Sequence, residues 1–231
     1  MSNVLDSDFN KLGLTLSVNP NDVSHQEIVD FIKMCFEIPK AQGIVYSACY
    51  VDVTQIDVVK NNGAVVVVRK QDEIVACALV YFQKCGFMFR NKRMYIFVDC
   101  VSPKFLRQGI SRMVTAFLLD FAKTQGCKYA FISTALNSPI NVDRNLKNGF
   151  YKWRINSYEG TDYYSILFRK DLKEPFLLMK IWQKFRFAYS CAWCKMCKNA
   201  DGSHTIIGSI IEKPLLLIRA TLINILKKIK K

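Results

Sequence analysis

A short segment between two regular elements has the residue types and spacing of a turn that binds phosphate. It runs Val98-Asp-Cys-Val-Ser-Pro-Lys-Phe-Leu-Arg-Gln-Gly-Ile-Ser111. Gly109 suits the close approach of a ligand to the backbone because it has no side chain. The N-terminus of the helix that follows adds N–H donors and fractional positive charge. The chemistry favoured here is therefore the binding of a phosphate or pyrophosphate.

The elements on both sides position this turn. Residues 93–101 are rich in aromatic and β-branched side chains and stop at Ser102-Pro103, which predicts a buried strand. After Gly109, apolar side chains have the spacing of an amphipathic helix that continues to about Gln125. This apolar set is Ile110, Met113, Val114, Phe117, Leu118 and Phe121.

The chain beyond this helix predicts a second strand and helix. Residues 129–136 have strand composition, Asn137-Ser-Pro is a helix start, and Lys147-Asn-Gly-Phe150 is a helix end. This order, with these end signals, resembles the GNAT superfamily of acyl-CoA-dependent N-acetyltransferases. The resemblance covers residues 12–172 by element order, and its specific motifs lie within residues 98–150.

The resemblance implies acetyl-CoA as co-substrate. In that family a loop of Gln or Arg, two residues, Gly, one residue, then Gly or Ala wraps the pyrophosphate. In the matching window Gln108 and Gly109 fit, whereas Leu106 and Ser111 depart from the pattern. The cofactor-binding residues that the resemblance implies are Cys100, Val101, Arg107, Gln108, Gly109, Ile110, Ser111, Asn137 and Asn145.

The general acid has more than one candidate. In many family members a tyrosine near the end of the second helix protonates the departing CoA thiolate. That position is Asn145 here, and an amide cannot donate a proton as an acid does. Tyr151 is a nearby candidate acid, with packing in the next strand as the alternative. A water molecule is a further alternative.

Asp99 is the first candidate for the general base that deprotonates the attacking amine. Strand alternation predicts that it shares a face with Phe97 and Val101, with Val98 and Cys100 on the other face. The alternative is a carboxylate that only accepts hydrogen bonds at a strand end. Further candidates for the base or for binding a cation are Glu37 and Asp52, in the region where the resembling family grips its acceptor.

The predicted fold is α/β: a GNAT-like, mixed and mostly antiparallel sheet with helices on both faces, where acetyl-CoA enters between parting central strands. A helix capped within Asn19–Asp22 should run to about Phe36, and residues 37–62 should form an irregular helix with loops. Residues 1–172 are the expected acetyltransferase domain, and residues 173–231 a helical appendage. The other predicted strands are 14–18, 64–70 and 74–82 as a hairpin, 151–158 and 162–169.

Charge and cysteine content limit the alternatives. The net charge is 33 − 19 = +14, of which residues 173–231 contribute 12 − 3 = +9. Nine cysteines and an acidic N-terminal segment without a leader pattern predict a cytoplasmic protein. With two histidines and no Walker or dinucleotide glycine motif, hydrolase and nucleotide-binding chemistry are disfavoured.

The appendage begins with residues 175–189, which predict an amphipathic basic helix. Three thiolates and an imidazole can bind zinc, but the spacing is not that of a standard pair of knuckles. We therefore expect no metal site, and favour thiols at helical spacing, with thiol acylation near a membrane as another alternative. The residues concerned are Cys191, Cys194, Cys197 and His204.

Residues 214–231 combine apolar and basic faces but are too short and too interrupted to span a bilayer. They favour an interfacial helix on an anionic membrane. The alternative is a helix docked on the catalytic domain or on a second subunit of a homodimer, and nucleic acid is a less favoured partner.

Three functions follow. The first is direct acetyl transfer from acetyl-CoA to a primary amine in a ternary complex at the cytoplasmic membrane face. The second is a catalytically weakened protein that still binds acyl-CoA. The third is a basic module that binds membrane or nucleic acid.

Overall fold

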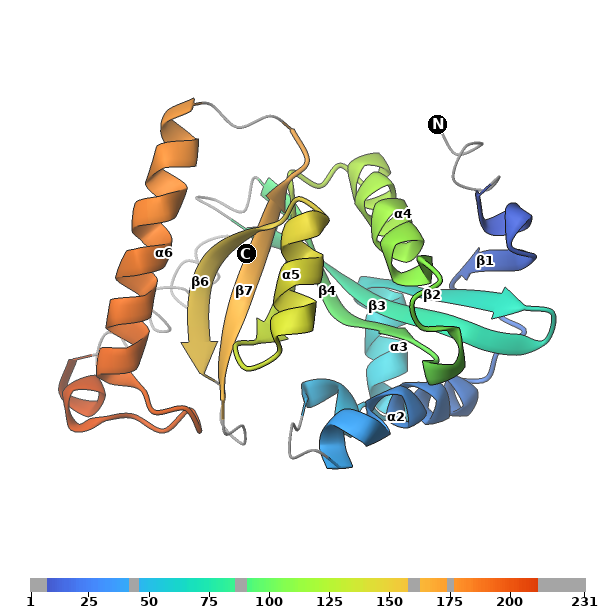
Figure 1. Cartoon of the computed structure of the whole chain (residues 1–231), viewed down its shortest axis with the longest axis horizontal. Helices are drawn as coiled ribbons and strands as arrows, with labels where there is room; N and C mark the ends of the chain where they lie inside the picture. Colours follow the sequence, from blue (N-terminus) through green and yellow to red (C-terminus); the bar gives the residue numbers. More distant parts are fainter. Residues whose placement is uncertain (1–7, 42–45, 86–90, 158–162, 174–176, 212–231) are drawn as a thin grey trace, which may run out of the picture. The chain divides into compact units, whose positions relative to one another are not determined.

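The computed structural model describes residues 8–41, 46–85, 91–157, 163–173 and 177–211. Its strands form one seven-stranded sheet in the order β1-β2-β3-β4-β5-β7-β6 (Figure 1). Neighbouring strands from β1 to β4 are antiparallel, and β4 and β5 are parallel. The strands are β1 (Leu14–Val18), β2 (Gly63–Lys70), β3 (Glu73–Cys85), β4 (Asn91–Val101), β5 (Tyr129–Ala135), β6 (Tyr151–Ser157) and β7 (Tyr164–Asp171). The predicted α/β class, opening strand and hairpin are confirmed.

Within the described residues, α-helices connect or follow these strands. They are α2 (His25–Ala41), α3 (Val53–Asn62), α4 (Ile110–Thr124), α5 (Pro139–Lys147) and α6 (Leu177–Cys197). The last of these confirms a helix in the appendage, whereas residues 212–231, which include the predicted interfacial helix, lie outside the described residues. Within the described residues, no helix combines the length and apolar character needed to cross a bilayer.

The chain forms two compact units. Unit 1 comprises residues 1–133, 143–151 and 168–175, and unit 2 comprises residues 134–142, 152–167 and 176–231. Unit 1 therefore holds β1 to β4 with α2, α3 and α4, and unit 2 holds α6 with most of β6. The predicted domain boundary between residues 172 and 173 stays a prediction.

The core of unit 1 explains why its strands are almost continuously apolar. Val65 to Val68 of β2 are all buried, because helices cover both faces of the sheet. Figure 1 shows α2 and α3 on one face and α4 on the other. Burying each Val, Leu or Ile side chain stabilises the fold by about 1.5–3 kcal/mol. Hydrophobic burial on both faces thus holds β4, the strand that carries the site.

The predicted cap of the first long helix is wrong. Helix α2 is capped by Ser24, whose hydroxyl accepts from the Glu27 N–H (3.2 Å), while the Glu27 carboxylate accepts from the Ser24 N–H (2.7 Å). This reciprocal pair satisfies two helix N–H groups at once. Asp22 instead accepts a hydrogen bond from Arg69.

Residues 37–62 are more regular than predicted. Helix α2 continues to Ala41, and Ser47–Tyr50 forms a short 3₁₀ helix before α3. Asp52 caps α3 by accepting from the Gln55 N–H at 2.8 Å. The expected second helix in this segment is confirmed, but its predicted irregularity is wrong, because this cap starts a regular α-helix.

Candidate active site

The central strands part within unit 1. Pairing between β4 and β5 runs from Arg93↔Tyr129 to Ile96↔Ile132 and then stops, although β4 continues to Val101. The backbone groups of β4 beyond Ile96 are therefore open to an extended ligand on the side that faces β5. The expected parting of the strands is confirmed.

A β-bulge lies where the strands part. Leu79 of β3 pairs with Val98, and Val80 pairs with Ile96, so Phe97 is the extra residue of β4. Phe97 packs against the same apolar cluster as Val98, beside Tyr81. The predicted alternation is therefore wrong for Phe97, because the bulge interrupts it.

The turn after β4 exposes backbone to ligand. Arg107 and Gly109 have left-handed φ angles of 64° and 81°. A Cβ at Gly109 would meet nothing within 4 Å, so the backbone angle and not space favours glycine there. Arg107, Gln108 and Gly109 are exposed. The segment therefore has the open geometry that a phosphate group requires.

The N-terminus of α4 completes this turn. Gly109 is the N-cap, and its carbonyl accepts from the N–H groups of Arg112 (3.0 Å) and Met113 (3.1 Å). No side chain of the described residues caps this end. The N–H groups of Ile110 and Ser111 lie in the first turn, where a helix has no carbonyl for them. An anion fits these donors and the helix dipole.

A polar chain joins the parted strand to this helix end. Arg144 of α5 donates through Nη1 to Ser111 Oγ (3.1 Å), and its Nη2 lies 3.4 Å from Asp99 Oδ2. The Asp99 side chain is 3% exposed, and that of Arg144 is 30% exposed. We name Asp99, Arg144 and Ser111 the open cluster.

Two buried atoms of the open cluster have no hydrogen-bond partner among the described residues: Asp99 Oδ1 and Arg144 Nε. Burial raises the pKa of Asp99 above its ordinary value, and the Arg144 charge opposes that rise. A carboxylate with a raised pKa and one uncommitted oxygen accepts a proton more readily than an ordinary carboxylate.

Tyr151 belongs to a different polar group, which we name the closed cluster: Tyr129, Tyr151, Arg169 and Asp171. Tyr151 donates its hydroxyl to Asp171 Oδ2 (3.0 Å), and Arg169 donates Nε to Asp171 Oδ1 (2.7 Å). The Arg169 guanidinium lies 3.9 Å from the centroid of the Tyr129 ring. Burial raises the pKa of Tyr151.

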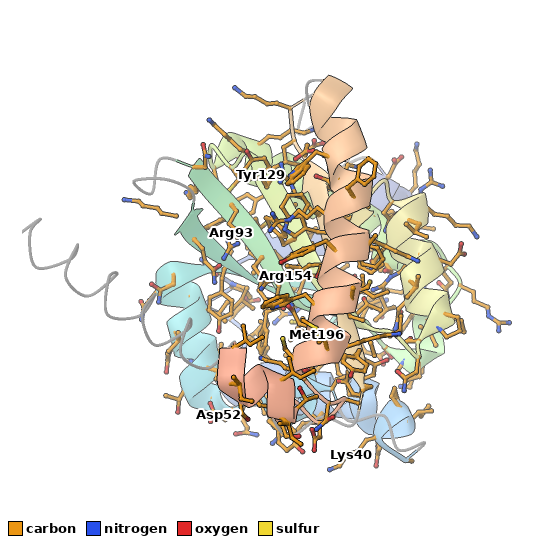
Figure 2. All side chains as sticks on the ribbon, turned by 90° about the vertical axis from the view of Figure 1, so that its left-hand side faces the viewer. Lys40, Asp52, Arg93, Tyr129, Arg154 and Met196 are labelled. Carbon is orange, nitrogen blue, oxygen red and sulfur yellow. The ribbon has the colours of Figure 1, made fainter. Side chains whose placement is uncertain are left out.

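The closed cluster lies at the other end of β4 from Asp99. Tyr129 pairs with Arg93, and Figure 2 shows these two residues near each other. Asp99 is six residues further along β4, about 20 Å at the rise of an extended strand. The structure therefore does not bring Tyr151 together with Asp99.

The other predicted cofactor residues occupy different surroundings. Cys100 is buried, and its thiol donates to the Cys77 carbonyl (3.6 Å), so only its backbone faces the parted strands. Val101 ends β4 and is half-buried. Asn145 is 2% exposed on α5, next to Arg144. Asn137 is exposed in a turn of unit 2.

The remaining candidates lie elsewhere. Glu37 is exposed on α2, and Asp52 is the α3 cap. Cys191, Cys194 and Cys197 lie on one helix, α6, and His204 follows it. No group of three metal-binding side chains occurs among the described residues.

Neither Arg144 nor the bulge at Phe97 was predicted from the sequence. A buried carboxylate needs a cation, so Asp99 signalled that an arginine or lysine would lie near it. Arg144, one residue before the position of the family tyrosine, and Lys147 lie on the same predicted helix. Their spacing in the sequence does not show which of the two is the cation beside Asp99.

Comparison with known proteins identifies the class of this protein as an acyl-group transferase. Residues 26–150 match the acetyltransferase (GNAT) family, which is more than half of the 231 residues. The chain therefore belongs to the GNAT family of acetyltransferases. No curated protein sequence gives a match.

Solved structures with the same fold are distant in sequence. A GNAT family acetyltransferase from Elizabethkingia anophelis with acetyl-CoA bound is 17% identical, with 69% of this chain and 98% of that chain covered, at a TM-score of 0.51. The Escherichia coli ribosomal-protein-S18-alanine N-acetyltransferase is 13% identical, with 71% and 97% covered, at 0.53. A putative acetyltransferase from Salmonella typhimurium with acetyl-CoA is 14% identical, with 71% and 96% covered, at 0.54. At these identities the likeness establishes the fold.

Proposed function

We propose that this protein transfers the acetyl group of acetyl-CoA directly to a primary amine in a ternary complex. One observation carries the proposal: β4 parts from β5 after Ile96 and leads through the exposed turn to the uncapped N-terminus of α4. The backbone of β4 suits the extended pantetheine arm, and the helix end suits the pyrophosphate. The acetyltransferase (GNAT) family match supports this choice of chemistry.

In this reaction Asp99 acts as the general base. Its Oδ1 is buried, so it takes a proton from the ammonium group through intervening water, and the neutral amine attacks the thioester carbonyl. The new C–N bond forms, the C–S bond breaks, and the nitrogen loses a second proton. The CoA thiolate takes up one proton from water, so the products are an amide, CoA and one released proton. Asp99 Oδ2 stays directed toward Arg144 during proton transfer.

The test measures thiol release from acetyl-CoA in the presence of a panel of primary amines, with binding of acetyl-CoA measured separately by calorimetry. We expect saturable binding, and free CoA that appears only with an accepted amine. Binding without turnover on any amine would support the catalytically weakened acyl-CoA-binding protein instead. Absence of acetyl-CoA binding would exclude both functions.

We further propose that α6 associates with the cytoplasmic face of an anionic membrane. Trp182, Phe185 and Tyr189 are 57%, 67% and 66% exposed, and they recur on one side of the helix with Met196, labelled in Figure 2. Exposed aromatic residues beside lysines are typical of interfacial helices. The +9 charge of residues 173–231 complements anionic lipid.

Another side of α6 is already occupied within unit 2. Ser190 Oγ accepts from the Ile155 N–H of β6 at 3.0 Å, and Cys194 and Cys197 are buried. The exposed aromatic side is thus the one left for a partner.

Flotation with vesicles of phosphatidylcholine and phosphatidylserine tests this association. We expect flotation of the full chain with anionic vesicles and its loss in the variant Trp182→Ala, Phe185→Ala, Tyr189→Ala. The control is Ile140→Ala, a side chain 82% exposed outside α6. Retention of DNA, or a dimer that the triple variant dissociates, without flotation would contradict the membrane proposal.

A further inference from the structure

We propose that Arg144 is a ligand of the pyrophosphate of the cofactor, held in place for that role by Asp99. This inference rests on the proposed function, because it names a further residue of the same acetyl-CoA site. In this arrangement the positively charged side chain at the phosphate site comes from α5, not from the turn after β4.

The position of the guanidinium carries the first step. Arg144 Nη1 lies 3.1 Å from Ser111 Oγ, and Ser111 is the second residue of α4. The first turn of a helix is where an anion is held by backbone N–H groups. The Arg144 charge therefore lies at the place where the pyrophosphate is expected.

The unused donors of Arg144 carry the second step. A guanidinium has five N–H donors in a planar fork. Nε is buried and has no partner among the described residues, and the contact of Nη2 with Asp99 Oδ2 is long at 3.4 Å. The two Nη groups carry four N–H donors, of which the contacts with Ser111 and Asp99 use two, and the side chain is 30% exposed. The fork matches phosphate oxygens geometrically, so a phosphate can accept from the remaining Nη donors.

The turn itself has no polar side chain at Leu106. Leu106 stands where resembling loops have Gln or Arg, and its side chain is 56% exposed with no polar group. Arg144 supplies from α5 a donor that Leu106 cannot. Asp99, 3% exposed, orients the guanidinium because a buried carboxylate keeps its cation close.

The test compares Arg144→Gln with Lys147→Gln, an equal charge change on the same helix at a side chain 76% exposed. We expect Arg144→Gln to weaken acetyl-CoA binding about tenfold to a hundredfold in calorimetry, and Lys147→Gln to leave it within about twofold. Inorganic pyrophosphate should compete with acetyl-CoA less well in Arg144→Gln. Arg144→Lys should recover part of the loss.

A double variant separates ligand binding from a structural role. If Arg144 only neutralised Asp99, then Asp99→Asn together with Arg144→Gln would restore wild-type binding, because neither buried charge would remain. We expect binding to stay weak in the double variant, with thermal unfolding used to confirm that it folds. Restored binding, or unchanged binding in Arg144→Gln, overturns the inference while leaving the proposed function intact. A wild-type chain that does not bind acetyl-CoA overturns both.

Discussion

Among the described residues of unit 1, two buried aspartates each lie beside an arginine, and the structure uses the two pairs differently. In the closed cluster Asp171 and Arg169 are 6% and 8% exposed, and both Asp171 oxygens accept hydrogen bonds. In the open cluster Asp99 is just as buried, yet one of its oxygens has no partner among the described residues. The same two residue types therefore occur in one cluster where both carboxylate oxygens accept hydrogen bonds, and in another where one carboxylate oxygen accepts none.

The difference separates a structural from a functional use of buried charge. A buried ion pair offsets its desolvation cost only when its remaining hydrogen bonds are made, as they are around Asp171. Polar atoms left unsatisfied cost stability, so their presence in the open cluster suggests a ligand or a proton transfer. The two clusters lie at opposite ends of β4, so variants in one can serve as controls for the other.

The largest expected effect is on turnover in Asp99→Asn. Loss of a general base should lower kcat by about 10²–10⁴-fold. In the unaltered enzyme kcat should rise with pH through the raised pKa of Asp99, because the base must be ionised, and Asp99→Asn should lose that limb. Steady-state kinetics across pH measure both. Asp120→Asn, an exposed carboxylate on α4, is the control, and equal kcat in both variants would assign Asp99 a positioning role only.

The variant Asp171→Asn should act on stability instead. Removing one partner of a buried pair costs about 3–5 kcal/mol, here because Arg169 would lose its counter-ion. Urea unfolding measures this loss, and kcat of the folded enzyme should change little. A large fall in kcat without a loss of stability would erase the distinction between the two clusters.

The variant Gly109→Glu should weaken acetyl-CoA binding by more than about a hundredfold, since its carboxylate would face the pyrophosphate and its backbone would be strained. Gly126→Glu is the matched control at the other end of α4. Gly126 has a φ of 72°, and a Cβ there also meets nothing within 4 Å. Calorimetry on both variants separates backbone strain from loss of the anion site, and equal losses would contradict an anion site at Gly109.

The variant Tyr151→Phe tests the candidate general acid. We expect a loss of about 1.5–3 kcal/mol in the free energy of unfolding, because Asp171 loses one hydrogen bond. We expect kcat to stay within about twofold, since the hydroxyl lies at the far end of β4. A fall in kcat of tenfold or more at unchanged stability would restore Tyr151 as the acid.

The smallest effect is on the pH dependence of stability. The folded-state pKa of Asp99 is raised, so its stabilising contribution is complete below the unfolded value of about 3.9 and is lost as pH rises through the folded value. Asp99→Asn should remove this component and flatten the profile. Urea unfolding at several pH values measures it, and an unchanged profile would contradict the raised pKa.

Local patterns predicted much of the scaffold. The hairpin of β2 and β3 follows from two β-branched runs around Gln71-Asp-Glu73, and α4 from its apolar period after Gly109. The predicted cap of α2 was wrong because capping residue types occur both within Asn19–Asp22 and at Ser24. Ser24 is the cap because it forms reciprocal hydrogen bonds with Glu27.

The sequence by itself determined the order of strands and helices, the glycine turn before α4 and a buried carboxylate that required a partner. These features depend on residues close together in the chain. Tertiary structure decided that Arg144, 45 residues after Asp99, is that partner, and that Tyr151 belongs with Asp171. It also decided where β4 leaves β5 and where Phe97 bulges. Contacts between distant segments depend on packing and register, which no local pattern specifies.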